Sequence, residues 1–161
     1  MSTRRQLGFL LLFSAPFASV AAQDHQHTGA DRLGRVVFPV SCSAQAQPQF
    51  EHAMAVLHSF WWEEAPQAFG AVLKTDSTCA MAHWGLALNA WGNPFTPGPS
   101  GELLQKGAAE AERAATLGAP TARERGLIAA TTALYRDHAT AASPARLRAY
   151  SDTLARVHRD F

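Results

Sequence analysis

The sequence predicts an all-α protein of about six helices arranged as antiparallel pairs. Apolar residues recur at helical spacing through most of the chain after residue 45. The joins between periodic segments are mostly short, which makes consecutive helices antiparallel neighbours. Alanine is abundant, and no useful length of sequence after Pro39 alternates with the period of a β-strand.

Composition indicates a single folded domain. The chain has 161 residues, of which 47% are hydrophobic and 17% are charged, and its net charge is +1. This hydrophobic content can fill a core and argues against disorder. A nucleic-acid-binding protein would concentrate basic residues on one face, whereas the Lys and Arg residues here are scattered. We therefore expect no nucleic-acid partner.

Residues 1–22 are typical of a secretory signal peptide. Arg4 and Arg5 form a basic start, Leu7 to Phe13 form a short apolar run, and small residues end at Ala22, where cleavage is expected. The apolar run is shorter than the about 20 residues of a membrane-spanning helix. The alternative is a buried N-terminal helix. We expect an exported protein, periplasmic or secreted, with no transmembrane segment in the mature chain.

Cys42 and Cys79 are the two cysteines of the chain. An oxidising compartment favours a disulfide between them, and both lie at the edges of one predicted helix pair. Their spacing fits neither a CxxC redox motif nor a four-ligand zinc site. The alternative is two separate buried thiols.

Residues 23–43 are expected to form a flexible N-terminal segment, because they begin with a polar, Gly-containing stretch. Within this segment, Val36 to Pro39 predicts a short extended stretch, since a proline biases the preceding residue away from helix. The helical domain is expected over residues 44–161.

The first predicted helix pair spans residues 46–60 and 63–74. Pro66 fits the first turn of the second helix, where a missing N–H costs little. Each helix carries an apolar stripe at helical spacing, formed by Phe50, Met54, Leu57 and Trp61 in the first and by Ala65, Phe69 and Val72 in the second.

Four further helices are predicted at residues 79–91, 102–117, 121–136 and 143–161. A loop rich in Gly and Pro, residues 92–101, separates the first two of them. Gly118 is a helix-ending signal. Thr121 and Glu124 form a capping box, and Ser143 with its following proline opens the last helix.

The first two pairs share a repeat. Ala65-x3-Phe69 matches the A-x3-F element in the second helix of the 34-residue tetratricopeptide repeat. Counting back on that register places the repeat start near Ala46. One period later lies Ala80, where a new helix is predicted.

The stretches LHSFWWEEA (residues 57–65) and CAMAHWG (residues 79–85) resemble a family of exported bacterial tetratricopeptide-repeat (TPR) proteins of unassigned biochemical function. The resemblance covers about residues 38–161 and implies a short TPR-like right-handed solenoid. Family members are usually longer, so we expect the helical domain to be truncated at its C-terminus. The chain departs from the family at His83, where an aromatic residue is usual.

Stacked helix pairs form a concave surface that accepts a peptide or partner segment. We therefore predict a non-catalytic scaffold of the cell envelope that binds a protein or peptide partner. A purely structural remnant, with its partner surface in a missing C-terminal part, is one alternative. The candidate groove residues lie mainly on the first helices of the pairs: Gln49, His52, Ala53, Val56, Trp62, His83 and Asn89.

The aromatic residues divide into two groups. Trp61, Trp84 and Trp91 lie on the apolar stripes and are predicted to be core. Trp62 and Phe95 lie off the stripes and are candidates for exposed contacts.

The sequence contains no H-E-x-x-H, no G-x-S-x-G and no P-loop, so we expect neither an enzyme nor a cofactor. The alternative hypothesis is a metal-binding or metal-dependent envelope protein. His58 and His83 can approach each other on neighbouring helices, with Glu63 or Glu64 as a third ligand for a divalent transition metal such as zinc. His25 and His27, near the start of the mature chain, can add ligands.

Overall fold

The computed structural model describes residues 33–93, 95–96 and 98–161, and this part of the chain contains six α-helices and no strand. The prediction of an all-α fold with six helices is therefore confirmed. The helices are α1 (Gln47–His58), α2 (Ala65–Thr75), α3 (Ala80–Trp91), α4 (Gly101–Leu117), α5 (Ala122–Tyr135) and α6 (Ser143–Asp160).

The helix ends follow from local sequence. A proline occupies the first turn of α1, α2 and α6, where no backbone N–H is required. Gly92 and Gly118 end α3 and α4 with φ values of 75° and 68°, which a residue with a side chain adopts rarely. The capping box at the start of α5 is present, because the Thr121 hydroxyl accepts a hydrogen bond from the Glu124 N–H at 3.2 Å.

The first turn is longer than predicted. Helix α1 ends at His58 and α2 begins at Ala65, whereas the predicted helices reached residue 60 and began at residue 63. Phe60 has a φ of 60°, a left-handed conformation that no helix accommodates. The residues from 59 to 64 therefore form the turn.

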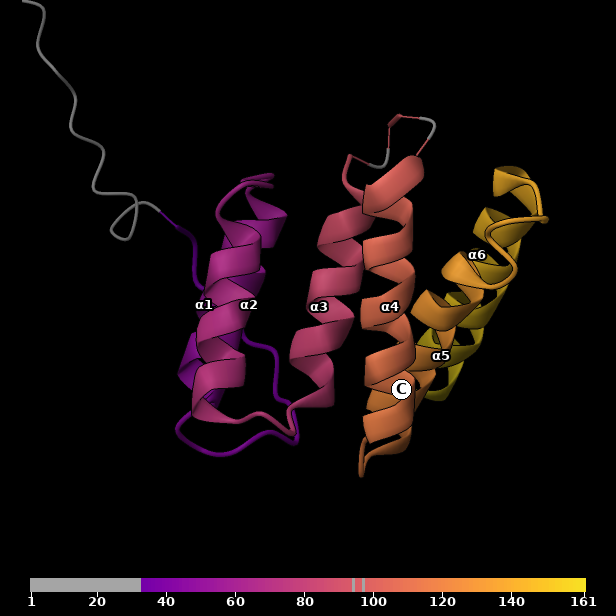
Figure 1. Ribbon diagram of the computed structural model, residues 1–161. Coiled ribbons are helices and arrows are strands. Elements are labelled where there is room, and N and C mark those ends of the chain that lie inside the picture. The colour runs from indigo at the N-terminus through magenta and orange to yellow at the C-terminus, as the bar shows by residue number, and fades with distance from the viewer. Residues whose placement is uncertain (1–32, 94, 97) are drawn as a thin grey trace, which may run out of the picture.

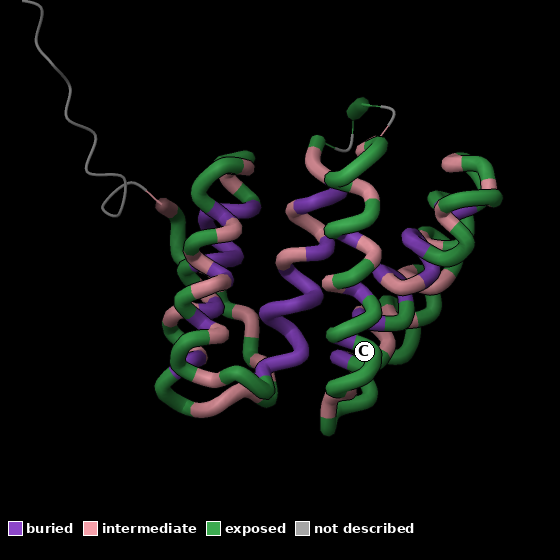
Figure 2. Tube along the Cα trace, in the orientation of Figure 1, coloured by how far each residue is buried: buried purple, intermediate pink, exposed green. Residues whose placement is uncertain are grey.

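Each helix is antiparallel to the one before it, and the pairs α1–α2, α3–α4 and α5–α6 follow one another across the molecule (Figure 1). Every helix contacts its neighbour in sequence, and α3 also contacts α1 and α5. Helix α3 is the most thoroughly buried element, as Figure 2 shows. None of the helices in the described part is long and apolar enough to cross a membrane.

The described part of the chain has two core clusters. The larger joins α1, α2 and α3, with Ala114 of α4 and Ile128 of α5, around Phe50, whose ring lies 5.9 Å from that of Phe69. The smaller joins α3, α4 and α5 around Trp91 and Tyr135, whose rings meet edge to face at 5.7 Å. The Tyr135 hydroxyl donates a hydrogen bond to the Ala87 carbonyl at 2.7 Å, so this buried phenol is satisfied.

An extended segment, residues 36–43, crosses the ends of several helices, and we call it the strap. Its Phe38 ring packs against Phe50 and Trp84, with centroids 5.7 Å and 5.8 Å apart. The Val40 N–H donates to the Gln47 side chain at 3.0 Å. The flexible segment predicted for residues 23–43 is therefore wrong for its last part, because the strap is tied to the helices.

The tryptophans differ from prediction in one case. Trp84 and Trp91 are buried, as predicted. Trp61 is 36% exposed, because the unexpected turn takes it off the α1 stripe. Trp62 is half-buried against the larger core cluster, and Phe95 is exposed, as expected for a residue off the stripes.

Candidate functional site

A groove of about 920 Å³ lies on the first helix pair, and no residue of α3 lines it. A volume of this size suits a small-molecule ligand or a few side chains of a partner. The lining residues come from α1, from the following turn and α2, and from the N-terminal segment: Pro48, Gln49, His52, Val56, Trp61, Glu64, Gln67, Ala68, Ala71 and Leu33.

Helical spacing explains how the groove forms. On α1 it is lined at positions 49, 52 and 56, and on α2 at positions 68 and 71, so each helix presents one face. The opposite faces carry Phe50 and Phe69, which fill the core. Because Ala68 and Ala71 end at Cβ, α2 contributes a low wall and the space between the helices stays open.

The two ends of the groove differ chemically. At one end the Thr75 hydroxyl donates to the Gln49 amide oxygen at 2.9 Å and links α2 to α1. At the other end lie Trp61 and Glu64, close to where α1 ends and α2 begins. The groove is thus mainly apolar between its ends, with His52 and Gln67 on its walls, polar at one end, and both aromatic and acidic at the other.

The predicted contact residues other than His83 fall in three places. Gln49, His52 and Val56 line the groove. Asn89 and Trp62 meet elsewhere, where the Asn89 amide donates to the Trp62 carbonyl at 3.2 Å. Ala53 is buried in the core and reaches no surface.

His83 lies on the far side of the larger core cluster and binds a residue of α4. Its Nδ1 lies 2.6 Å from Oε2 of Glu110, in a largely buried ion-pair geometry. The pair borders a pocket of about 450 Å³ that Ser77 and Arg113 also line. A carboxylate that holds an imidazole is one half of an acid–base site, but no hydroxyl in the described part hydrogen-bonds to His83.

The three-ligand metal site proposed for His58, His83 and Glu63 or Glu64 is not assembled. His58 is exposed at the end of α1, whereas His83 is buried in the first turn of α3 and pairs with Glu110. Because α1 and α3 run in the same direction, the two histidines lie toward opposite ends of these helices. The described residues contain no group of three His, Cys, Asp or Glu side chains arranged to hold a metal ion. His25 and His27 lie outside the described residues.

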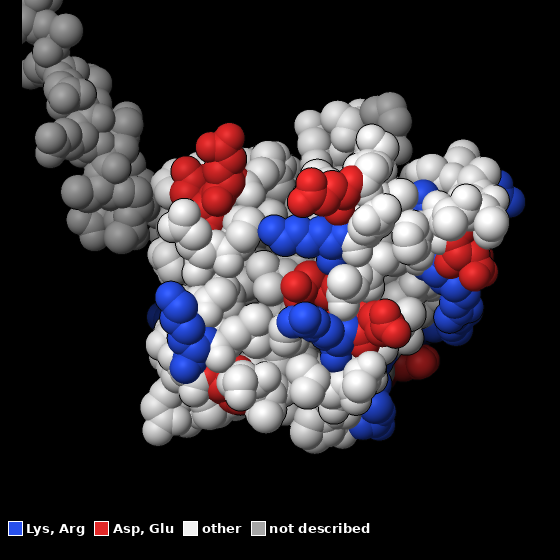
Figure 3. Space-filling view, in the orientation of Figure 1, with Lys and Arg blue, Asp and Glu red and all other residues white. Residues whose placement is uncertain are grey.

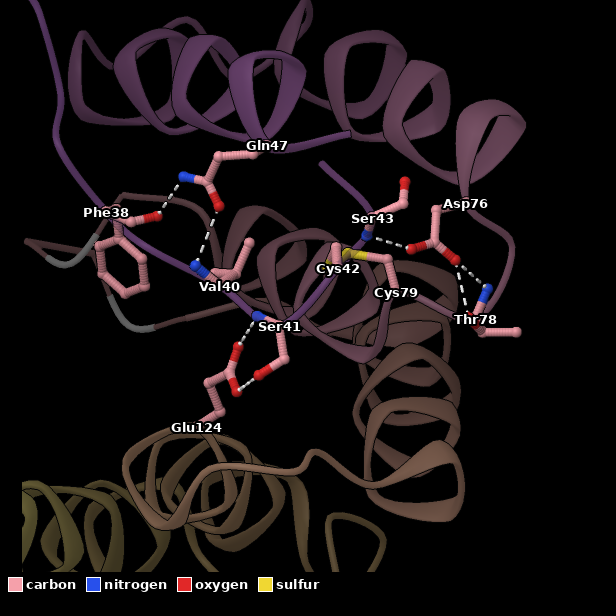
Figure 4. The surroundings of a disulfide bond; sticks show 10 residues. All are labelled: Phe38, Val40, Ser41, Cys42, Ser43, Gln47, Asp76, Thr78, Cys79 and Glu124. Atoms are coloured by element: carbon pink, nitrogen blue, oxygen red, sulfur yellow. Dashed lines mark hydrogen bonds between the residues drawn. A yellow bond between two sulfur atoms is a disulfide. The ribbon is translucent and has the colours of Figure 1, made fainter. Parts of the chain in front are cut away.

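The predicted disulfide joins Cys42 of the strap to Cys79 at the start of α3, as Figure 4 shows. The closed loop spans 37 residues in sequence, for which the chain-entropy model gives about 3–4 kcal/mol of stability. Beside it, the Asp76 carboxylate accepts hydrogen bonds from the Ser43 N–H at 2.7 Å and the Thr78 hydroxyl at 2.7 Å. The bond from the Ser43 backbone, with that from the Thr78 side chain, lowers the pKa of Asp76.

Glu124 of α5 holds the other side of the strap. Its carboxylate accepts hydrogen bonds from the Ser41 N–H at 2.6 Å, from the Ser41 hydroxyl and from the Thr121 hydroxyl. Burial opposes ionisation of Glu124, but the hydrogen bonds from Ser41 and Thr121 outweigh it and lower the pKa of this carboxyl. The strap is therefore fixed to both the second and the third helix pair.

The sequence analysis did not predict several residues of these sites. Trp61, Glu64 and the alanines of α2 were absent from the predicted groove, which drew mainly on first helices. The available signal is their spacing, since positions 64, 68 and 71 form a stripe opposite the predicted core stripe of α2. Glu110 and Glu124 carry no such signal, because their partners lie 27 and 83 residues away.

Comparison of the chain with protein families, with curated proteins and with solved structures finds no match.

Proposed function

We propose that this protein is a non-catalytic binding module that takes up a helical segment of a partner protein in the groove between α1 and α2. The observation that carries the proposal is the groove itself, about 920 Å³ of open space on a helix pair whose other face is a closed core. Two antiparallel helices with an open space between them can bind the apolar face of a third helix, as in a helix-in-groove complex.

The dimensions support this mode of binding. Positions 49 to 56 on α1 and 64 to 71 on α2 each span about 10 Å along the helix axis. Apolar side chains at i, i+4 and i+7 of a partner helix span the same length. The exposed Trp61 at one end supplies the kind of aromatic anchor that dominates binding energy at such interfaces.

The architecture proposed for this module is a short TPR-like right-handed solenoid. The antiparallel order of the helices and the contact of α3 with both α1 and α5 support it. We also propose that the chain is exported after loss of residues 1–22. The disulfide supports this location, since such bonds persist in oxidising compartments.

Selection from a displayed library of helix-forming peptides tests the function. Selected peptides are expected to bind the wild-type protein and to lose at least about tenfold in affinity for Ala71→Trp and for Ala68→Trp, each of which fills the groove from α2. Ala149→Trp on the exposed surface of α6 is the matched control and is expected to bind normally. Equal binding by all four proteins would refute the groove as the site.

A further inference from the structure

We infer that the groove recognises a basic amphipathic helix, one that carries a Lys or Arg beside its apolar anchors. This inference rests on the proposed function and specifies the chemistry of its partner. It is carried by the charge and the aromatic surface at one end of the groove.

Two carboxylates lie at that end without a cation. Glu64 lines the groove and Glu63 precedes it, and both side chains are exposed. The ion pair found in the described part is His83–Glu110, so no Lys, Arg or His side chain in this part pairs with either glutamate. Figure 3 shows the resulting acidic patch at the end of the first helix pair, where α1 ends and α2 begins.

The N-terminus of α2 explains why Glu63 and Glu64 are favourable there, but it does not use their carboxylates as hydrogen-bond acceptors. A helix N-terminus favours carboxylates by a few tenths of a kcal/mol through its dipole. Neither Glu63 nor Glu64 makes a capping hydrogen bond to α2. Their oxygens therefore remain available as acceptors for a partner's ammonium or guanidinium group.

Trp61 adds a second reason to expect a cation. Its side chain is 36% exposed and lines the groove together with Glu64. A Lys or Arg that reaches Glu64 also passes the tryptophan ring, where a cation–π contact contributes about 0.5–1 kcal/mol at an exposed site. An acidic partner side chain would meet repulsion from Glu64 and gain nothing from the ring.

The groove also has a polarity. Glu64 is the carboxylate among its lining residues, whereas Gln49, near the other end, is neutral. A basic side chain on the partner is therefore attracted to the Trp61 and Glu64 end. Apolar anchors between the two ends contact Val56, Ala68 and Ala71.

Two synthetic helical peptides of about 15 residues test this inference. They share leucines at i, i+4 and i+7 and differ in that one carries two lysines where the other carries two glutamates. Titration of the full chain is expected to show about fivefold or greater preference for the lysine peptide at low salt. The preference is expected to shrink at high salt, because rim charges are screened.

Charge reversal locates the effect. Glu64→Lys is expected to reverse the preference, so that the glutamate peptide binds better, while Trp61→Leu is expected to weaken the lysine peptide more than the glutamate peptide. Glu112→Lys, an exposed site on α4, changes the net charge equally and is expected to leave the preference unchanged. Circular dichroism confirms that each variant is folded.

The outcomes separate this inference from the proposed function. Equal affinity of both peptides, with loss of both in Ala68→Trp, would overturn the basic-partner inference and retain the groove. An equal shift in Glu64→Lys and Glu112→Lys would also overturn it, since net charge alone would then explain the preference. Binding unaffected by Ala68→Trp would overturn the function as well. Self-association that Ala68→Trp abolishes would assign the groove to a second copy and overturn the basic-partner inference.

Discussion

Glu124 joins three parts of the chain through one carboxylate. It lies in the first turn of α5, binds the Thr121 cap, and accepts two hydrogen bonds from Ser41 of the strap. Glu124 is almost completely buried, so these hydrogen bonds replace the ones that its carboxylate makes to water in the unfolded chain. A neutral side chain at this position keeps the shape but loses the charge that strengthens the bonds.

We expect stability to depend on pH through this residue. Because the pKa of Glu124 is lower in the folded protein than its ordinary value of 4.5, the folded state binds fewer protons than the unfolded chain. Its contribution is therefore present above pH 4.5 and is lost as pH falls through the folded pKa. Glu124→Gln is expected to lower the free energy of unfolding by about 2 kcal/mol at pH 7 and progressively less below pH 4.5.

Urea unfolding at a series of pH values from 7 to 3 measures how the difference in free energy of unfolding between the wild type and Glu124→Gln shrinks as the pH falls. Glu112→Gln, on the exposed surface of α4, is the control and is expected to track the wild type. The wild type retains some acid sensitivity from Asp76, whose pKa is also lowered. A gap between Glu124→Gln and the wild type that stays constant down to pH 3 would contradict the role given to the carboxylate.

At the scale of elements, close helix approach depends on glycine. A Cβ at Gly85 of α3 would lie 2.2 Å from the Phe69 ring of α2, whereas a Cβ at Gly70 of α2 would meet nothing within 4 Å. The two glycines thus differ in surroundings although both lie inside helices. Gly85 lets the aromatic ring of one helix rest on the backbone of the next.

Replacement by alanine is expected to have opposite effects at these two positions. Gly85→Ala is expected to destabilise the protein by about 1–3 kcal/mol, because the Phe69 ring must move. Gly70→Ala is expected to stabilise it by about 0.5–1 kcal/mol through helix propensity. Thermal and urea unfolding give both values, and stabilisation by both substitutions would show that α2 and α3 are not as closely packed as the structure has them.

Sequence reasoning predicted these elements well because their limits are local. Prolines, the Thr121 cap and terminal glycines set most helix ends to within two residues. The turn before α2 was predicted too short, because Phe60 adopts a left-handed conformation that is uncommon for its residue type. The α1 side of the groove was predicted from helical faces. The His83–Glu110 pair and the attachment of the strap depend on residues far apart in sequence, which no periodicity reveals.

Over the whole molecule, burial is uneven. Helices α1, α3 and α5 carry most of the buried residues, whereas α6 has a single one, Arg146 (Figure 2). That arginine donates from Nη1 to the Leu134 carbonyl at 3.0 Å and lies over the Trp91 ring at 5.6 Å. Since Leu134 is near the end of α5, the cation also meets the negative end of the helix dipole. One long side chain thus links the first turn of α6 to α5 and to Trp91 of α3.

Local stability should follow this distribution. Elements with few buried contacts open more readily than the core, so amide hydrogen exchange is expected to be faster in α6 than in α3. Arg146→Ala is expected to speed exchange in α6 at least tenfold, since it removes a charge-assisted hydrogen bond and a cation–π contact together worth about 1.4 kcal/mol or more. Exchange in α1 to α3 is expected to change little, because the larger core cluster contains no residue of α6.

Arg148→Ala separates the role of contact from that of charge. Arg148 is exposed on the same helix, so its loss removes an equal charge without touching Trp91 or Leu134. We expect this variant to exchange like the wild type. If Arg146→Ala instead accelerated exchange evenly in all six helices, the protein would open as one unit, and the helix pairs would not be the separately stable units that a stacked-repeat architecture implies. Acceleration confined to α6, and at most to α5 beside it, would support that architecture through the energetics of the chain.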